Sequence, residues 1–116
     1  MKPAAGHSFL PLSPQVFQVL LSLHGEPQHG YAIIQDVRAR TKDEMRLTAS
    51  TLYDALARLV DQGLIEEVNP PIGTSDARRR FYGLTPLGRD VAKLEVRRLE
   101  QLIEMARAKR VVRTPR

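Results

Sequence analysis

Apolar side chains recur at helical spacing in four segments, which alternate with short stretches rich in Gly, Pro and polar residues. The first segment begins at Ser13 and Pro14, because a serine cap followed by a first-turn proline is a common helix start. It ends before Gly25 and Pro27, residues that interrupt helices. The pattern predicts a core helix between these signals.

The second segment is shorter, and the helix it predicts should begin between residues 28 and 31. Its apolar stripe consists of Tyr31, Ile34 and Val37. Basic residues gather towards its end, where the helix dipole favours positive charge.

The third segment has the clearest helical pattern, with Thr48 as its predicted N-cap and Gly63 as its C-terminal stop. The predicted buried face is formed by Ala49, Leu52, Tyr53, Leu56, Leu59 and Val60. The opposite face carries small or polar side chains, namely Ser50, Thr51, Asp54, Ala55 and Arg58. Such a face can enter a major groove without a clash, although periodicity alone fits an ordinary solvated face equally well.

Two predicted strands follow, at residues 64–68 and 79–84, and the stretch 69–77 between them is rich in turn-forming residues. On the second strand Tyr82 and Leu84 should pack on the helices, and Arg79 shares the other face with Phe81. A helix, a strand and a basic hairpin in this order are typical of a winged helix-turn-helix. The pattern therefore predicts a domain of the kind that binds a nucleic-acid duplex.

The fourth segment begins at Thr85 and Pro86, again a cap followed by a proline. Beyond the positions that can cover the domain, a second stripe recurs at spacings of four and three, formed by Ala92, Val96, Leu99, Ile103 and Ala106. This stripe resembles a coiled-coil seam, and a symmetry-related copy of the helix is the simplest cover for it. We therefore expect a homodimer; the alternative is that the stripe folds back on its own domain.

The predicted fold class is mainly α with a small β wing, a winged helix-turn-helix followed by a C-terminal dimerisation helix. Residues 1–12 are expected to form a flexible N-terminal arm and residues 13–85 the DNA-binding domain. Residues 86–110 form the dimerisation helix and residues 111–116 a basic tail.

Charge is distributed unevenly along the chain. Residues 1–75 carry six Lys or Arg and eight Asp or Glu, whereas residues 76–116 carry twelve and five, which together give the net charge of +5. The positive charge is thus concentrated in the wing and beyond it, where Arg78, Arg79 and Arg80 can meet phosphates flanking a groove. A polyanionic partner is the natural expectation, although surplus arginine can also simply solubilise a small domain.

Several classes of function are disfavoured. The chain has no cysteine, so disulfides and thiolate metal sites are excluded. His7, His24 and His29 lack metal-ligand spacing, and no nucleophile motif or phosphate loop is present, so we expect no metal, no cofactor and no enzymatic activity. No segment is apolar over the length that a membrane span needs, which predicts a soluble cytoplasmic protein.

The order and spacing of several residues resemble the PadR family of transcriptional regulators, in its short form with a single C-terminal helix. The matching residues are His29, Gly30, Tyr31, Ile33, Leu52, Tyr53, Leu56, Arg58, Leu59, Gly63, Leu64, Ile65, Arg80, Tyr82, Leu84, Thr85, Gly88 and Arg89. The resemblance implies a homodimer that binds a dyad-symmetric operator on double-stranded DNA, usually as a repressor. The chain departs from the family pattern at Asp54, where Pro is common, and at Ala49 or Ser50, where Gly is common.

The residue pattern and the resemblance together give one set of candidate DNA-binding residues: Lys42, Thr48, Ser50, Thr51, Tyr53, Arg58, Arg78, Arg79 and Arg80. The resemblance also implies that a small apolar effector could release the DNA. The main alternative is a winged-helix module that contacts RNA or protein without operator specificity, because basic wings suit both functions.

Overall fold

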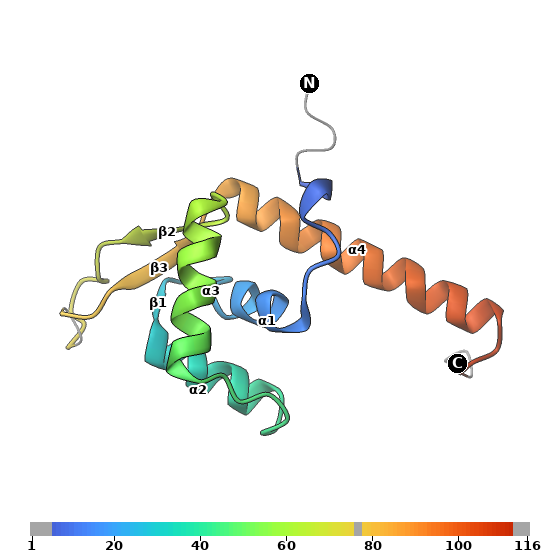
Figure 1. Ribbon diagram of the computed structural model, residues 1–116, viewed down its shortest axis with the longest axis horizontal. Helices are drawn as coiled ribbons and strands as arrows, with labels where there is room; N and C mark the ends of the chain where they lie inside the picture. Colours follow the sequence, from blue (N-terminus) through green and yellow to red (C-terminus); the bar gives the residue numbers. More distant parts are fainter. Residues whose placement is uncertain (1–5, 76–77, 113–116) are drawn as a thin grey trace.

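The computed structural model describes residues 6–75 and 78–112, and Figure 1 shows the arrangement of their elements. Along the chain these are the 3-10 turn η1 (His7–Phe9), α1 (Pro14–Ser22), β1 (Gln28–His29), α2 (Gly30–Arg40), α3 (Ala49–Asp61), β2 (Ile65–Val68), β3 (Phe81–Leu84) and α4 (Pro86–Ala108). The winged helix-turn-helix with a long last helix, predicted as mainly α with a small β wing, is confirmed.

The three predicted helix starts are confirmed in detail, because each capping hydroxyl accepts a hydrogen bond from a backbone N–H three residues later. The capping residues are Ser13, Thr48 and Thr85. Thr85 also donates a 2.6 Å hydrogen bond to the carbonyl of Gly63, which ties the start of α4 to the end of α3. The caps therefore fix where helices begin and also how two of them meet.

The sheet contains one strand more than the sequence pattern predicts. Its strand order is β1-β3-β2, with Gln28 opposite Tyr82 in an antiparallel ladder. Strand β1 has only two residues, too few for an alternating pattern to reveal it. Helix α2 consequently starts at Gly30, with His29 as its N-cap.

Strand β3 lies in the middle of the sheet, and all four of its residues are buried. Tyr82 and Leu84 pack into the helical core as predicted, and on the other side of the strand the His29 ring packs edge-on against Phe81, with centroids 5.2 Å apart. The strand also starts at Phe81 rather than at Arg79, which leaves the arginines in the wing.

The core lies where α1, α2 and α3 meet the sheet and the first half of α4. In α2 the buried apolar residues are Ile33 and Val37, which confirms the prediction for Val37, whereas Tyr31, also predicted in the apolar stripe, is 54% exposed. In α3 the core covers only Leu52, Leu56 and Leu59. The wider stripe predicted for α3 is wrong at three positions, because Ala49, Tyr53 and Val60 are exposed.

The N-terminal arm packs against α4 over the residues that the structure describes, instead of extending away from the domain. Gly6 lies so close to α4 that a Cβ there would sit 2.7 Å from Leu94. The backbone N–H of Leu12 donates to Glu95 Oε1 at 3.4 Å, and Phe9 packs against the core. The expectation of a flexible arm therefore does not describe residues 6–12, and residues 1–5 lie outside the described part.

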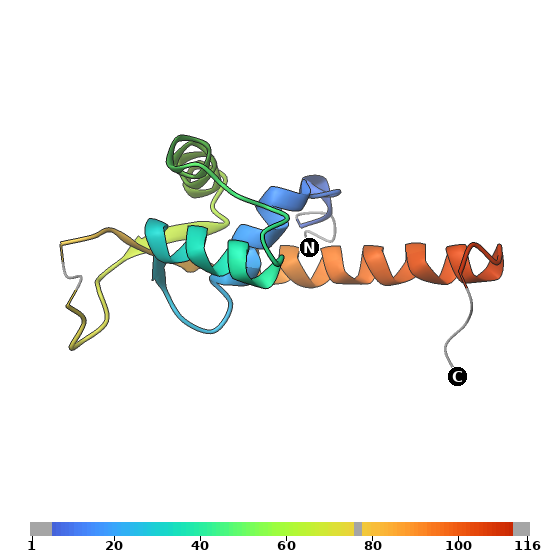
Figure 2. The same ribbon diagram turned by 90° about the horizontal axis from the view of Figure 1, so that it is seen from below.

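Helix α4 crosses the domain and then continues beyond it (Figures 1 and 2). It has 23 residues, about 35 Å at the usual rise, and ends at Ala108, two residues before the predicted end. At its start, a Cβ on Gly88 would lie 2.0 Å from the carbonyl oxygen of Leu64, so only glycine allows this crossing. Of the predicted basic tail, residues 111–112 are exposed and 113–116 lie outside the described residues. No helix in the described ranges combines the length and apolarity that crossing a bilayer requires.

Candidate nucleic-acid interface

The outer face of α3 is polar and accessible. Ser50, Thr51, Asp54 and Arg58 are all exposed, while the opposite side of the helix is buried in the core. Because the residues at the N-terminal end have short side chains, the backbone of the helix can approach a surface closely there. Asp54 and, two turns later, Asp61 are acidic residues on this face and would repel phosphate groups.

The first turn of α3 is held by its own side chains. Thr48 Oγ1 accepts from the N–H of Thr51 at 3.1 Å and donates to Thr51 Oγ1 at 2.9 Å. The Thr48 hydroxyl proton is therefore already used within the helix. Thr51 still has its own hydroxyl proton to donate, so it is the better placed of the two for an outside acceptor.

Tyr53 leans against the start of α2. A Cβ on Gly30 would lie 2.5 Å from the Tyr53 hydroxyl oxygen, so the two helices meet here only because residue 30 has no side chain. Because Gly30 is the first residue of α2, the Tyr53 hydroxyl lies at the N-terminal end of that helix, where the helix dipole favours negative charge. Tyr53 is 49% exposed.

Arg79 reaches the same place from the wing. Its guanidinium carbon is 5.4 Å from the centroid of the Tyr31 ring, a cation–π distance, and its Nη1 is 3.2 Å from His29 Nδ1. His29 Nδ1 also accepts from the N–H of Ala32 at 3.1 Å. The His29 ring therefore caps α2 and also lies against Arg79.

Together these residues line a cavity of about 350 Å³, which we call the tyrosine–arginine cleft. Its residues are His29, Gly30, Tyr31, Tyr53, Arg79 and Arg80. A guanidinium, phenol hydroxyls and a helix N-terminus are all donors or positive ends, so the chemistry of the cleft suits an oxyanion such as a phosphate. Tyr53, an exposed residue of α3, lines the cleft, so the cleft lies next to this helix.

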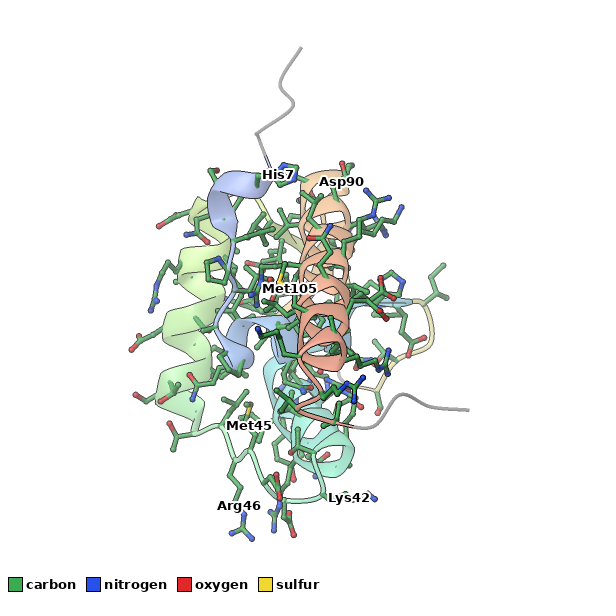
Figure 3. All side chains as sticks on the ribbon, turned by 90° about the vertical axis from the view of Figure 1, so that its right-hand side faces the viewer. His7, Lys42, Met45, Arg46, Asp90 and Met105 are labelled. Carbon is green, nitrogen blue, oxygen red and sulfur yellow. The ribbon has the colours of Figure 1, made fainter. Side chains whose placement is uncertain are left out.

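Lys42 is presented by the turn between α2 and α3. Lys42 and Asp43 have positive φ values of 52° and 68°, and Asp43 forms ion pairs with Arg38 and Arg46. The hydrogen bond from Arg38 lowers the pKa of the Asp43 carboxyl, which keeps it ionised. Figure 3 shows Lys42 and Arg46 pointing outwards at one end of the molecule.

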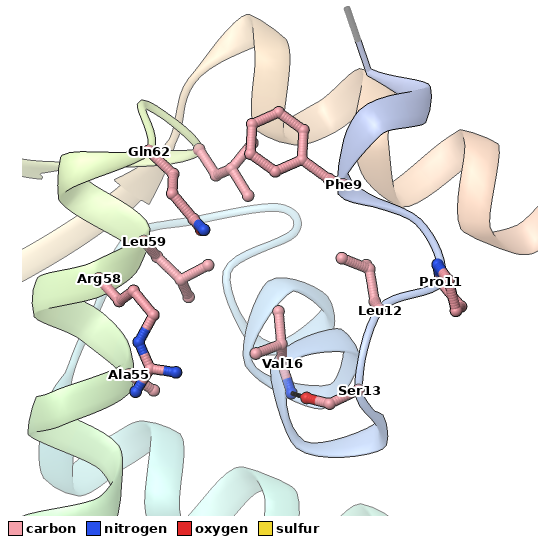
Figure 4. A pocket seen from close by; sticks show the side chains of 10 residues that line it. Phe9, Pro11, Leu12, Ser13, Val16, Ala55, Arg58, Leu59 and Gln62 are labelled. Carbon is pink, nitrogen blue, oxygen red and sulfur yellow. Dashed lines mark hydrogen bonds between the residues drawn. The ribbon is translucent and has the colours of Figure 1, made fainter.

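The candidate residues thus fall into separate places. Tyr53, Arg79 and Arg80 meet in the cleft, while Arg78 is exposed on the wing. Arg58 lies five residues after Tyr53 on α3 and lines a different cavity (Figure 4). The sequence interpretation missed the contribution of His29 and Tyr31 to the cleft; the only signal was the His-Gly-Tyr order at a helix start.

The stripe predicted as a dimer seam is covered over part of its length. Ala92 is 8% exposed and packs within its own chain, so it contributes little surface to a partner. Leu99 and Ala106 are partly buried, whereas Val96 and Ile103 are exposed. On the same projecting half of α4, Leu102 and Met105 are also exposed. The accessible apolar surface therefore starts at Val96.

The family of the chain follows from its sequence. Residues 19–94, from the middle of α1 to the first half of α4, match the Transcriptional regulator PadR-like family. The chain belongs to the PadR-like family of transcriptional regulators. None of the curated proteins matches this PadR-like chain.

Solved structures of PadR-family regulators have the same fold. A PadR family transcription regulator from Clostridium difficile R20291 shares 24% identity, with 80% of this chain and 94% of that chain covered and a TM-score of 0.68. A transcriptional regulator from Clostridium thermocellum shares 23%, covering 93% and 97%, with a TM-score of 0.65.

A third structure contains DNA. Bacillus subtilis PadR in complex with operator DNA shares 23% identity, with 72% of this chain and 46% of that chain covered and a TM-score of 0.59. The likeness to these structures concerns the fold. It places the elements of this PadR-like regulator in an architecture that has been solved together with operator DNA.

Proposed function

We propose that this PadR-like regulator binds a dyad-symmetric operator as a homodimer and represses transcription. In this proposal the N-terminal half of α3 lies in the major groove, with Ser50 and Thr51 towards the bases. The wing arginines and Lys42 contact the phosphate backbone on either side.

The tyrosine–arginine cleft is the observation that carries this proposal. A guanidinium stacked on an aromatic ring, next to a phenol hydroxyl and a helix N-terminus, presents positive charge and hydrogen-bond donors that suit a backbone phosphate. Its position beside α3 means that one phosphate bound there would set the register of the helix in the groove.

The projecting half of α4 supports the homodimer. Val96 and Ile103 are seven residues apart, so they are exposed on one side of α4, and a second copy of α4 would cover them. Two recognition helices related by a twofold axis then read two half-sites, which explains why the operator should be dyad-symmetric.

Binding to a DNA fragment from the protein's own promoter region tests this proposal. Fluorescence anisotropy should give a dissociation constant at least about a hundredfold lower for one palindromic site than for a scrambled duplex in the same salt. Equal affinity for both duplexes would contradict operator specificity. Tighter binding to RNA than to any duplex would instead favour an RNA-binding module.

A further inference from the structure

Asp54 lies at the centre of the exposed face of α3. It is two residues from both Leu52 and Leu56, which are buried in the core, so its side chain leaves the helix roughly 160° away from theirs. Ser50 precedes Asp54 by one turn on the same side, and both residues are exposed. The Asp54 carboxylate therefore points away from the domain, towards whatever surface α3 meets.

The Asp54 carboxylate is satisfied by water alone. None of the hydrogen bonds and ion pairs in the described part of the chain involves it. Arg58 follows Asp54 at the spacing of helical ion pairs, yet it lines the cavity of Figure 4 and forms no pair with Asp54. Asp43, which is also exposed, does pair with Arg38 and Arg46. The charge of Asp54 is thus left for a partner of α3 to repel or to bind.

A carboxylate in a major groove has few possible partners. The phosphates on both walls of the groove repel it, and so do the acceptor atoms of guanine and thymine. The donors on the groove floor are the amino groups of cytosine and adenine. Adenine carries the N7 acceptor beside its amino group, whereas cytosine presents its amino group without such a neighbour. An aspartate that faces the base edges is therefore best matched by cytosine.

We infer that Asp54 is a specificity-determining residue of α3 and accepts a hydrogen bond from the N4 amino group of one cytosine in each half-site. This role rests on the proposed function, because it requires the N-terminal half of α3 to lie in the major groove. The short side chains of Ser50 and Thr51 let the helix backbone approach the base edges, so the short aspartate side chain reaches them. Guanine is rejected at this position, because its O6 and N7 acceptors would face the carboxylate.

Asp61 provides a comparison within the same helix. It is exposed and lies seven residues, about two turns, after Asp54, hence on the same side of α3. As the last residue of α3, it lies beyond the N-terminal half that enters the groove in the proposed complex. Both carboxylates weaken binding to a polyanion through their charge, but only Asp54 contacts bases. The two effects can therefore be separated by changing one residue at a time.

Selection of binding sites from a random DNA library with the full-length protein tests this role. Wild type should enrich a half-site with a cytosine at one position, and Asp54→Ala should lose the preference at that position alone. Asp54→Asn should move the preference there from cytosine to adenine, because an amide can pair with both N6 and N7 of adenine. Asp61→Asn makes the same change of charge and should select the wild-type site. Thermal melting confirms that each variant folds.

Fluorescence anisotropy on the selected duplex then measures the discrimination. Replacing the cytosine in one half-site should weaken wild-type binding about tenfold, and most strongly when guanine takes its place. The same replacements should change the affinity of Asp54→Ala by less than about twofold, because no carboxylate then faces the base. All measurements use one salt concentration, since removing either carboxylate should raise the affinity for every duplex.

The role of Asp54 is refuted if its two variants keep every base preference of wild type, or if the preference they change is for a base other than cytosine. In either case the proposed function stands, because wild type still selects a site. If Asp54→Ala and Asp61→Asn raise the affinity for all duplexes equally and select the same site, Asp54 acts by charge alone and does not read a base. If wild type selects no sequence, the proposed function fails and the role of Asp54 fails with it.

Discussion

Helices α3 and α4 are both amphipathic, yet they differ in the face that the core leaves uncovered. On α3 the exposed face near the N-terminus is short and polar, with Ser50, Thr51 and Asp54. On α4 it includes an apolar stripe formed by Val96 and Ile103. On both helices, therefore, the side chains of the uncovered face follow a pattern that packing of the domain's own core does not require.

The difference indicates two kinds of partner. Exposing a polar face to water costs little free energy, so such a face can bind reversibly in a hydrated groove. An apolar face loses stability whenever it meets water, so it suits a lasting contact with another protein chain. In the proposed function, α3 is the surface that binds DNA and α4 is the surface that binds a second protomer.

The largest effect should come from charging the exposed face of α4. In Val96→Glu/Ile103→Glu, like charges would face each other across the seam, so sedimentation should show monomers. Operator affinity should fall at least about a hundredfold, because each monomer then binds only a half-site. Leu99 is less suitable for this test, since it is partly buried in its own chain.

Gln101→Glu/Ala108→Glu is the matched control, because it adds the same charge at exposed positions away from Val96 and Ile103. The control should remain dimeric. If Val96→Glu/Ile103→Glu remains dimeric, α4 does not hold the protomers together and another surface does.

The next largest effect should come from the cleft. Replacing Arg79 and Arg80 with Ala removes its two guanidinium groups, so affinity for all duplexes should fall about ten- to a hundredfold. The slope of log affinity against log salt should decrease by roughly one to two units. Lys93→Ala, an exposed cation on α4, should change neither quantity. Loss of specific binding alone would mean that the wing contacts bases rather than phosphates.

A smaller effect is expected from displacing Tyr53 without removing a charge. In Gly30→Ala the new methyl group must push the Tyr53 ring away from α2, because it would lie 2.5 Å from the hydroxyl. We expect roughly tenfold weaker DNA binding with a stability loss of about 1 kcal/mol or less, since the tip of an exposed side chain can move. Tyr53→Phe, which keeps the ring and loses only the hydroxyl, should cost less affinity. Unchanged binding in both variants would remove Tyr53 from the interface.

The smallest effect concerns the contact between α4 and the arm, where Glu95 is 2% exposed, accepts hydrogen bonds from Arg98 and accepts another from the backbone N–H of Leu12. The Arg98 hydrogen bond lowers the pKa of Glu95, against the effect of burial. Glu95→Gln should therefore cost about 1–2 kcal/mol of unfolding free energy at pH 7, measured by urea denaturation.

The pH dependence of this loss has a definite sign. A lowered pKa in the folded state stabilises the protein above the ordinary glutamate pKa, and this contribution disappears as the pH falls through the lower folded value. The difference between wild type and Glu95→Gln should thus shrink in acid. Glu104→Gln, which alters the more exposed pair with Arg107, should show little difference at any pH. Equal losses in the two variants would refute the role of Glu95 in holding the arm.

Capping residues and periodicity predicted where three helices begin, but they did not predict strand β1. The caps at Ser13, Thr48 and Thr85 are confirmed because a capping hydroxyl acts on a backbone N–H three residues away, a distance that sequence spacing sets. Strand β1 was not predicted, since two residues have no periodicity and pair only because β3 lies beside them.

The sequence predicted several individual residues of the candidate site but not that they come together in one cleft. Arg79, Arg80 and Tyr53 were recognised by charge, position and family resemblance, but Tyr31 was expected in the core and His29 only at a helix start. Their grouping depends on contacts between residues 50 positions apart, such as that of Arg79 with His29. Spacing along the chain does not encode such a contact.

The sequence by itself determined the four helices, the basic wing and the order that makes a winged helix, because these follow from periodicity, caps and charge within a few residues of each other. Only the tertiary structure decided which part of each apolar stripe is buried. It placed Tyr31 and Tyr53 at the surface, covered Ala92, and packed the arm on α4. The physical reason is that burial depends on which element lies opposite a residue, and that element is usually distant in the sequence.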